Sequence, residues 1–247
     1  IRLRPLMNRT SGISEMAIGL IDGPVVMSHP ALANQRVREV PGKSSGSCNL
    51  ISSAACSHGT FVAGILSASR GAAAPALCPD CTLLVRPIFA ESTGVNNNVP
   101  AAKPEELAQA ILDCIYAGAR VLNISASLMQ PSAKNERAVV DALDQAARHR
   151  VIVVVAAGNQ GTLDSSAITR HPWVIPVIAC SLSSRPISET NLGRSIGRTG
   201  LSAPGEGITS LGTKGHSLTL SGTSAAAPFV TGAIALLWSA FRAATAT

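Results

Sequence analysis

Four short apolar runs recur along the chain, with helix-like segments between them, and this alternation limits the fold more than any other feature. The runs are EMAIGLID at 15–22, TLLVRPIF at 82–89, ARVLNISA at 119–126 and RVIVVVAAGN at 150–159. Continuous apolar strands that alternate with helices are typical of a parallel sheet covered on both faces. We therefore expect an α/β fold with three layers, αβα, around a mainly parallel sheet.

Two of the segments between these runs carry clear helix signals. PEELAQAILDCIYAGA at 104–119 opens with proline and glutamates, and SAKNERAVVDALDQAARHR at 132–150 opens at a serine and ends on basic residues. Both patterns suit the helix dipole. No repeat or linker divides the 247 residues, so we expect one domain over 1–247. Because the chain starts at Ile1 without a methionine, we also expect an excised or processed fragment of a longer protein.

The composition excludes several classes of protein. Apolar residues make up 46% and charged residues 14%, so the chain can bury a large core and is not disordered. The apolar stretch at 225–241 is interrupted by Pro228 and falls short of the roughly 20 residues of a membrane span, so a buried core helix is expected. The net charge is +6, but aromatic residues are only 3%, which leaves no stacking platform for nucleic acid.

Asp22 stands apart among the aspartates, because it alone ends a predicted apolar strand. The others lie between two cysteines, in a polar loop or on amphipathic helices. A carboxylate is costly to bury unless it is paired. Reactive groups of parallel sheets gather at the carboxyl ends of the strands. Asp22 is therefore a candidate to orient a histidine.

His58 stands apart among the five histidines. The stretch CSHGTFVAGILSA at 56–68 places it at the start of an apolar helix, where Gly59 and Ala63 keep its surroundings small. The other histidines fall in turns, in a glycine-rich loop and at a helix end. A lone histidine is more often structural than catalytic, so His58 is a catalytic candidate only together with an aspartate and a serine.

The stretch SGTSAAAPF at 221–229 carries the candidate nucleophile of that set. Gly222 permits a tight turn, and an apolar helix is predicted to begin at about Ser224. A hydroxyl at a helix start lies at the positive end of the dipole, which favours the oxyanion formed in acyl transfer. Ser221 and Thr223 fit better the alternative role of a helix N-cap.

Taken together, these motifs resemble those of the subtilisin-type serine proteases, the subtilases (peptidase family S8). IGLIDG at 18–23 resembles the aspartate motif of the family, HGTFVAGIL at 58–66 its histidine motif, SGTSAAAPFVTGAIALL at 221–237 its serine motif and AAGNQG at 156–161 its oxyanion segment. NLG at 191–193 and SAPG at 202–205 also recur in the expected places. The order of aspartate, histidine and serine is that of subtilisin.

The resemblance implies a subtilisin-like fold and a serine endopeptidase that works through an acyl-enzyme. Ser224 then attacks the scissile carbonyl, His58 transfers the proton, and Asp22 orients the imidazolium. The side chain of Asn159 and the backbone N–H of Ser224 are implied as donors to the oxyanion. In the family, the segment matching NISAS binds the substrate backbone as an added strand. The implied substrate-binding residues are Ser125, Ala126, Ser127, Ala157 and Gly158.

Departures from the family pattern narrow the resemblance. Asp22 is followed by Gly23-Pro24-Val25, where the family usually has serine or threonine and then glycine. This form, with RPIF at 86–89, most resembles the small subtilases that trim precursor peptides in cyanobactin-type pathways. Ser127 and Leu128 replace glycines that are common in the family, which counts against a deep pocket for large side chains.

Two other functions stay open on the same residues. A peptide macrocyclase or transpeptidase would form the same acyl-enzyme at Ser224, and an inactive homologue would only bind peptides. The cyclising relatives resemble subtilases with a helical cap between the aspartate and histidine motifs. Here Asp22 and His58 are 36 positions apart, with no two-helix pattern between them, which favours hydrolysis.

The six cysteines are many for a subtilase. Cys114 and Cys180 lie in apolar surroundings and are expected to be inert core thiols. For Cys48, Cys56 and the CPDC segment at 78–81, disulfides and reduced thiols both stay open, while a zinc site from all four is disfavoured by unequal spacings. Calcium is common in the family, but no acidic cluster marks a site, so no cofactor is expected. A secreted and a cytoplasmic location both stay open.

Overall fold

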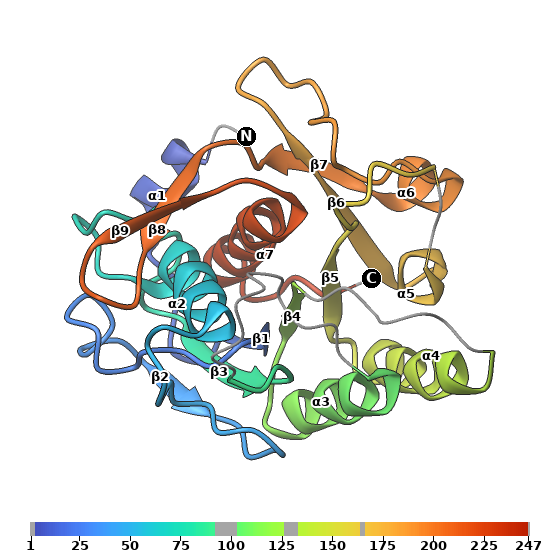
Figure 1. Cartoon of the computed structure of the whole chain (residues 1–247), viewed down its shortest axis with the longest axis horizontal. Coiled ribbons are helices and arrows are strands. Elements are labelled where there is room, and N and C mark those ends of the chain that lie inside the picture. Colours follow the sequence, from blue (N-terminus) through green and yellow to red (C-terminus); the bar gives the residue numbers. More distant parts are fainter. Residues whose placement is uncertain (1–2, 92–102, 126–132, 164–165, 247) are drawn as a thin grey trace.

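The structure is a computed structural model that describes residues 3–91, 103–125, 133–163 and 166–246. Its central element is a sheet of seven strands in the order β2-β3-β1-β4-β5-β6-β7 (Figure 1). All the pairs in this sheet are parallel. The strands are β1 Ala17–Asp22, β2 Val37–Glu39, β3 Thr82–Pro87, β4 Val121–Ile124, β5 Ile152–Ala156, β6 Val174–Cys180 and β7 Leu201–Pro204. A separate antiparallel hairpin joins β8 Ile208–Leu211 to β9 Ser217–Leu220.

Helices cover both faces of this sheet. They are α1 Arg4–Arg9, α2 Ala54–Ser67, α3 Pro104–Tyr116, α4 Ala133–Arg148, α5 Ala167–Arg170, α6 Arg194–Thr199 and α7 Thr223–Ala240. Figure 1 shows α2 and α7 on one side of the sheet and α3 and α4 on the other. The predicted strands and helices are all present in the described residues, with ends that differ by a few positions.

The sequence of β1 explains why helices pack on both faces. All six of its residues are buried, and neighbouring side chains point to opposite sides of a strand. Ile18 and Leu20 belong to the apolar core shared with α2 and α7, whereas Ala17 and Ile21 belong to the core shared with α3 and α4. The predicted three-layer α/β fold around a mainly parallel sheet is therefore confirmed.

The path of the chain reverses direction in the sheet between β1 and β4. After β1 the chain moves outward to β2 and returns through β3, then crosses to β4 and continues outward to β7. β1 and β4 are nonetheless neighbours, with Ile21 opposite Ile124 near their carboxyl ends. In open α/β sheets, binding sites form beside the carboxyl ends of strands at such a reversal. This topology places the expected site next to Asp22.

α7 packs through the middle of the molecule. Its composition and its 18 residues would also suit a membrane span, but 67% of it is buried inside the protein. It contacts β4, β5, β6 and β7 on the sheet, and it also packs against α2. The expectation of a core helix over this stretch is confirmed.

A buried arginine ties β3 to α3. Arg86, 1% exposed, donates from Nε to Asp113 Oδ2 and from Nη2 to Glu106 Oε1, both at 2.9 Å. A third bond, from its Nη1 to the carbonyl of Pro87, measures 2.6 Å. A buried charge is tolerated when it is paired and hydrogen-bonded in this way. The cluster fixes the end of β3 against α3.

Candidate active site

The carboxylate of Asp22 and the imidazole of His58 meet at the carboxyl end of β1. His58 Nδ1 lies 2.7 Å from Asp22 Oδ1, which also accepts a hydrogen bond from the Gly23 N–H at 2.6 Å. Asp22 is fully buried and His58 is 7% exposed. Since the carboxylate can only accept, Nδ1 carries the proton and Nε2 of the neutral ring is left to accept one.

The pKa of His58 is raised above its usual value of 6.5. Burial disfavours the imidazolium and by itself lowers the pKa. The charge of Asp22 and the hydrogen bond to it both raise the pKa, and together they outweigh burial. The pair therefore stabilises a positive charge on His58, as a general base requires when it takes up a proton.

Two glycines let α2 approach β1 closely enough for this contact. A Cβ at Gly23 would collide with the backbone carbonyl of Ala55, and a Cβ at Gly59 would collide with the carbonyls of Gly23 and Pro24. The unusual glycine after Asp22 is thus a packing requirement. Asp22 Oδ2 is buried without a hydrogen-bond partner among the described residues, and a glycine at position 23 offers it no side-chain donor.

Ser224 is the second residue of α7 and is half-buried. The turn before the helix is made by Gly222, whose φ of 130° belongs to the region that favours glycine. Within the described residues, neither the hydroxyl nor the backbone N–H of Ser224 has a hydrogen-bond partner, and no bond to His58 is formed. Catalytic hydrogen bonds of unliganded enzymes are often long and tighten on binding. α2, which carries His58, packs against α7, which carries Ser224.

Thr223 links the start of α7 to the segment that follows β5. Asn159 Oδ1 accepts from the backbone N–H of Thr223 at 2.9 Å and from its hydroxyl at 3.0 Å. The Thr223 hydroxyl oxygen also accepts from the Gly158 N–H at 3.2 Å. Because a backbone N–H can only donate, the oxygen of the Asn159 amide must face Thr223. Its Nδ2 then has no hydrogen-bond partner among the residues that the structure describes, and the side chain is exposed.

The expectation that Ser221 or Thr223 caps α7 is wrong. The N-cap is Gly222, and no side chain accepts a hydrogen bond there. Ser221 Oγ instead accepts from the Gly207 N–H at 2.9 Å. The Thr223 hydroxyl is occupied by residues 158 and 159, across the site. Both hydroxyls therefore form hydrogen bonds with residues distant in sequence and do not cap the helix.

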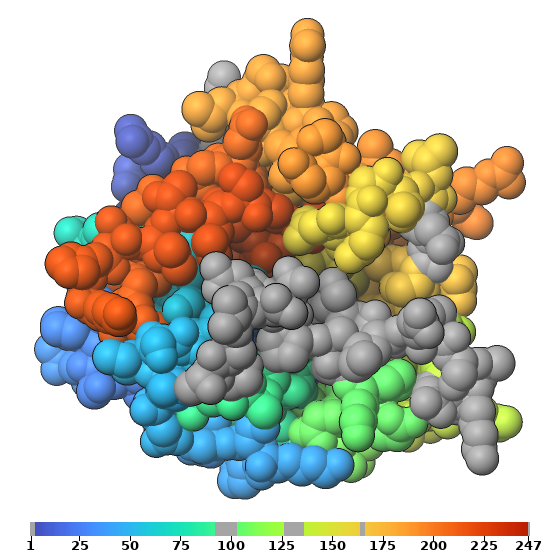
Figure 2. Space-filling view, in the orientation of Figure 1, coloured from blue at the N-terminus to red at the C-terminus, as the bar shows by residue number. Residues whose placement is uncertain are grey.

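The expected substrate-binding residues lie at the same edge of the sheet, as far as the structure describes them. Ser125 directly follows β4 and is buried, and Ala157 and Gly158 directly follow β5. Ala126 and Ser127 fall outside the described residues. In Figure 2, the dark red of α7 lies in a hollow between the orange of the β8–β9 hairpin and the yellow of the segment after β5.

Four supporting residues were not recognised in the sequence as partners of the site. Thr231 on α7 donates to Asn123 Oδ1 at 2.9 Å, and Asn123 Nδ2 donates to Ser125 Oγ at 2.8 Å. Asn191 Oδ1 accepts from the backbone N–H groups of residues 160 and 162, which shapes the loop after β5. The fourth is Thr223. A polar residue inside an apolar strand or helix, as in VLNI, is the signal that could have revealed two of them.

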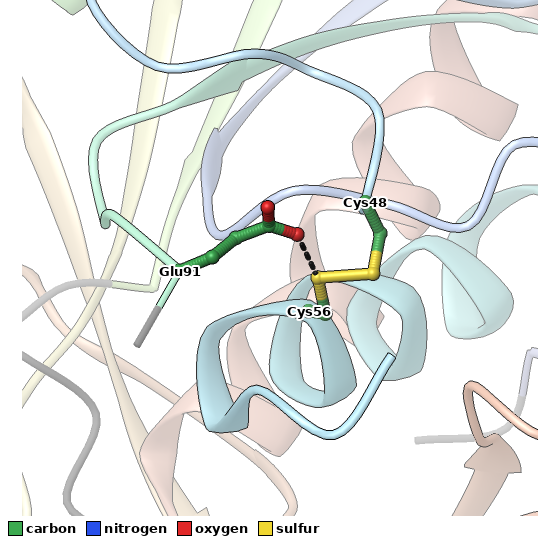
Figure 3. Close-up of side chains that lie close together, drawn as sticks. All are labelled: Cys48, Cys56 and Glu91. Atoms are coloured by element: carbon green, nitrogen blue, oxygen red, sulfur yellow. Dashed lines mark hydrogen bonds between the residues drawn. A yellow bond between two sulfur atoms is a disulfide. The ribbon is translucent and has the colours of Figure 1, made fainter. Parts of the chain in front are cut away.

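The cysteines divide into one disulfide and four free thiols. Cys48 and Cys56 form the disulfide, and Figure 3 shows Glu91 against it. The free thiols are all buried: Cys78, Cys81, Cys114 and Cys180. Burial raises the pKa of Cys114 to about 12, so this thiol is inert as expected. A zinc site from Cys48, Cys56 and the 78–81 pair is not formed, because the described residues keep the two pairs in separate places.

The profile of the subtilase family matches residues 14–247 of this chain. Among curated relatives, the subtilisin-like serine protease Pen ch 13 of Penicillium rubens is 34% identical over 185 residues, which cover 73% of this chain. The chain spans only 42% of the length of that relative.

Several solved structures share the fold. The protease domain of PatA is 28% identical with a TM-score of 0.82, over 92% of this chain and 80% of that one. Prenylagaramide maturation protease PagA is 26% identical with a TM-score of 0.85, over 97% and 80%. The PatG macrocyclase domain, at 21% identity and a TM-score of 0.82 over 96% and 79%, shows likeness of fold alone.

Proposed function

The chain belongs to the subtilase family, and from this premise we propose that it is a serine endopeptidase that hydrolyses peptide bonds through an acyl-enzyme. The observation that carries the proposal is the 2.7 Å contact between His58 Nδ1 and Asp22 Oδ1. This contact leaves Nε2 of His58 available as a base. The helix that carries His58 also packs against the helix that carries Ser224.

In the proposed reaction, Ser224 Oγ attacks the carbonyl carbon of the scissile bond while its proton passes to His58 Nε2. The imidazolium then gives this proton to the leaving amine, and the acyl-enzyme is left on Ser224. Water then adds to the acyl carbonyl while it loses a proton to His58, and the imidazolium gives this proton to Ser224 Oγ as the acid product leaves. The Asp22 carboxylate stabilises the imidazolium at both stages, in agreement with the raised pKa of His58.

The oxyanion has two candidate donors, Asn159 Nδ2 and the backbone N–H of Ser224. The Asn159 amide is turned so that Nδ2 is free, because Thr223 holds its oxygen. The Ser224 N–H lies in the first turn of α7, where helix N–H groups have no partner within the helix and the dipole favours negative charge. Preorganised donors of this kind stabilise the transition state of acyl transfer.

The substrate class follows from the family as a peptide or protein. We extend the proposal to the maturation of a precursor peptide, because PagA is a maturation protease and is 26% identical to this chain over 97% of its length. The residues proposed to hold the substrate backbone are those named from the sequence: Ser125, Ala126, Ser127, Ala157 and Gly158. The chain spans less than half of the length of Pen ch 13. The activity and substrates of the whole protein are therefore part of this proposal.

Covalent labelling with a fluorophosphonate tests the nucleophile directly. We expect Ser224→Ala to abolish both labelling and peptide cleavage. Ser221→Ala is the matched control, three residues away and outside the proposed site, and it should still be labelled. Labelling that persists in Ser224→Ala would reject Ser224 as the nucleophile, and a folded wild type that is never labelled would favour an inactive peptide-binding homologue.

A further inference from the structure

The Cys48–Cys56 disulfide joins α2, which carries His58, to a loop that is hydrogen-bonded to the segment after Asp22. Three residues after Asp22, the carbonyl of Val25 accepts from the Cys48 N–H at 3.0 Å, and the Val25 N–H donates to Gly46 at 2.9 Å. Cys56 lies on α2, two residues before His58. The disulfide, shown in Figure 3, therefore braces α2 against the loop that holds the segment after β1 through these hydrogen bonds.

Glu91, which follows β3, places a carboxylate against this brace. Its Oε1 lies 2.6 Å from Cys56 Sγ and accepts from the backbone N–H groups of Asn49 at 2.7 Å and Leu50 at 2.9 Å. These two donors hold the carboxylate in place whatever the state of the sulfur atoms. Carboxylates that bind metal ions are commonly oriented by hydrogen bonds of this kind.

The three side chains have the chemistry and the spacing of metal ligands. Both sulfur atoms and a carboxylate oxygen lie within 4.8 Å of one another. Two thiolates and a carboxylate form a ligand set that suits Zn²⁺. In a tetrahedral site with zinc–sulfur bonds of about 2.3 Å, the sulfur atoms lie about 3.8 Å apart. The Cα atoms of Cys48 and Cys56 are 5.5 Å apart, so small side-chain rotations are enough to reach that distance.

We propose that Cys48, Cys56 and Glu91 bind one Zn²⁺ ion when the disulfide is reduced. A dithiol reductant supplies two electrons and two protons, which break the S–S bond and give two thiols, while the reductant becomes a disulfide. Zn²⁺ then displaces both thiol protons to solvent. The fourth position of the ion is left to water or to a further donor.

The ion replaces the disulfide as the link between the same two segments. In oxidising surroundings the covalent bond braces the Asp22–His58 pair, and in reducing surroundings the ion does so. The ion takes no part in peptide hydrolysis. The proposal is thus independent of the proposed function, and it can be tested in the Ser224→Ala variant.

The test measures zinc binding in a Cys78→Ser, Cys81→Ser background, since the C-x-x-C pair is the other dithiol in the chain. The folded protein is titrated with Zn²⁺, once after oxidation and once after reduction with a phosphine, and the bound zinc is counted by elemental analysis. We expect one ion per reduced chain and none per oxidised chain. Co²⁺ in the reduced protein should give thiolate-to-cobalt charge-transfer bands and tetrahedral ligand-field bands.

Variants separate this site from adventitious binding. Glu91→Gln should weaken zinc binding at least tenfold, on the order of losses seen when metal-site groups are altered, while Glu206→Gln, at an exposed position, should leave it unchanged. Bound zinc should also raise the melting temperature of the reduced protein relative to a chelator. A reduced chain that binds no zinc, cobalt spectra without thiolate bands, or equal affinity in Glu91→Gln would each overturn the proposal.

Discussion

Thr223 donates two hydrogen bonds to the side-chain oxygen of Asn159, at 2.9 Å from its backbone and 3.0 Å from its hydroxyl. The two residues are 64 positions apart in the chain. One comes from the start of α7 and the other from the loop after β5. The relationship fixes the proposed oxyanion donor relative to the proposed nucleophile, which is the next residue along the chain.

Replacing this hydroxyl should slow the reaction without weakening substrate binding. In Thr223→Val the shape is kept but the hydroxyl bonds to residues 158 and 159 are lost, so the Asn159 amide is less well held. One hydrogen bond is worth about 0.5–1.5 kcal/mol, and we expect kcat to fall by roughly threefold to tenfold at constant KM. Thr223→Ser, which keeps the hydroxyl, should retain most of the rate. Equal losses in both variants would contradict a role through the hydroxyl.

Removing the amide itself should have a larger effect of the same kind. Asn159→Ala takes away a donor that is used only when negative charge develops on the substrate oxygen. We expect kcat to fall by roughly 10²–10³ with little change in KM, a magnitude that subtilisin itself supplies. Steady-state kinetics on one peptide substrate measure both constants. If the change lay in KM alone, Asn159 would not face the oxyanion.

The raised pKa of His58 should appear in the pH profile. Catalysis needs the neutral imidazole, so kcat/KM is expected to fall as the pH drops through the pKa of His58, with a midpoint above pH 6.5. In a Ser224→Ala protein, NMR titration should find the same pKa. The further change Asp22→Asn should move it below 6.5, since burial alone lowers it. A pKa that does not respond to Asp22→Asn would refute this account.

The same shift couples His58 to stability. Because the folded-state pKa is raised, the charged pair stabilises the folded protein below the unfolded pKa, near 6.5. This contribution is lost as the pH rises through the folded pKa.

The Arg86 cluster should matter for stability rather than for chemistry. Arg86→Met leaves the carboxylates of Glu106 and Asp113 beside an apolar side chain. Breaking a buried ion pair from one side costs about 3–5 kcal/mol, and urea unfolding should show a loss of that order. Arg198→Met, at an exposed position, is the control and should change little. If Arg86→Met lowered the free energy of unfolding by less than about 1 kcal/mol, the ion pairs of Arg86 would not be important for stability.

The fate of the acyl-enzyme distinguishes hydrolysis from cyclisation. Every residue between β1 and α2 is described, and that interval holds the short strand β2 and turns, without a helix that could shield the ester from water. We therefore expect linear acid products that incorporate ¹⁸O from labelled water. Mass spectrometry of the products of a linear peptide measures both. Mainly cyclic product without the label would favour a macrocyclase.

Short motifs predicted the residues whose own chemistry is distinctive. Asp22 ends an apolar strand and His58 lies near the start of an apolar helix, so the residues around them in the sequence predicted that they pair. The role of Thr223 was misassigned, because a hydroxyl near a helix start suits a cap equally well, and its partner lies 64 positions away. The burial of Arg86 was likewise hidden, since both of its carboxylate partners lie on a later helix.

The order of the elements along the chain has a consequence for synthesis. Asp22 and His58 are made early, and Asn159 after β5, but Ser224 belongs to α7, which follows every other described helix and strand. α7 also fills the space between α2 and the sheet, so its absence leaves that face of the core open. A nascent chain on the ribosome therefore holds the acid and the base before it holds the nucleophile. The proposed protease therefore stays inactive at least until α7, the helix that completes this core, has been synthesised.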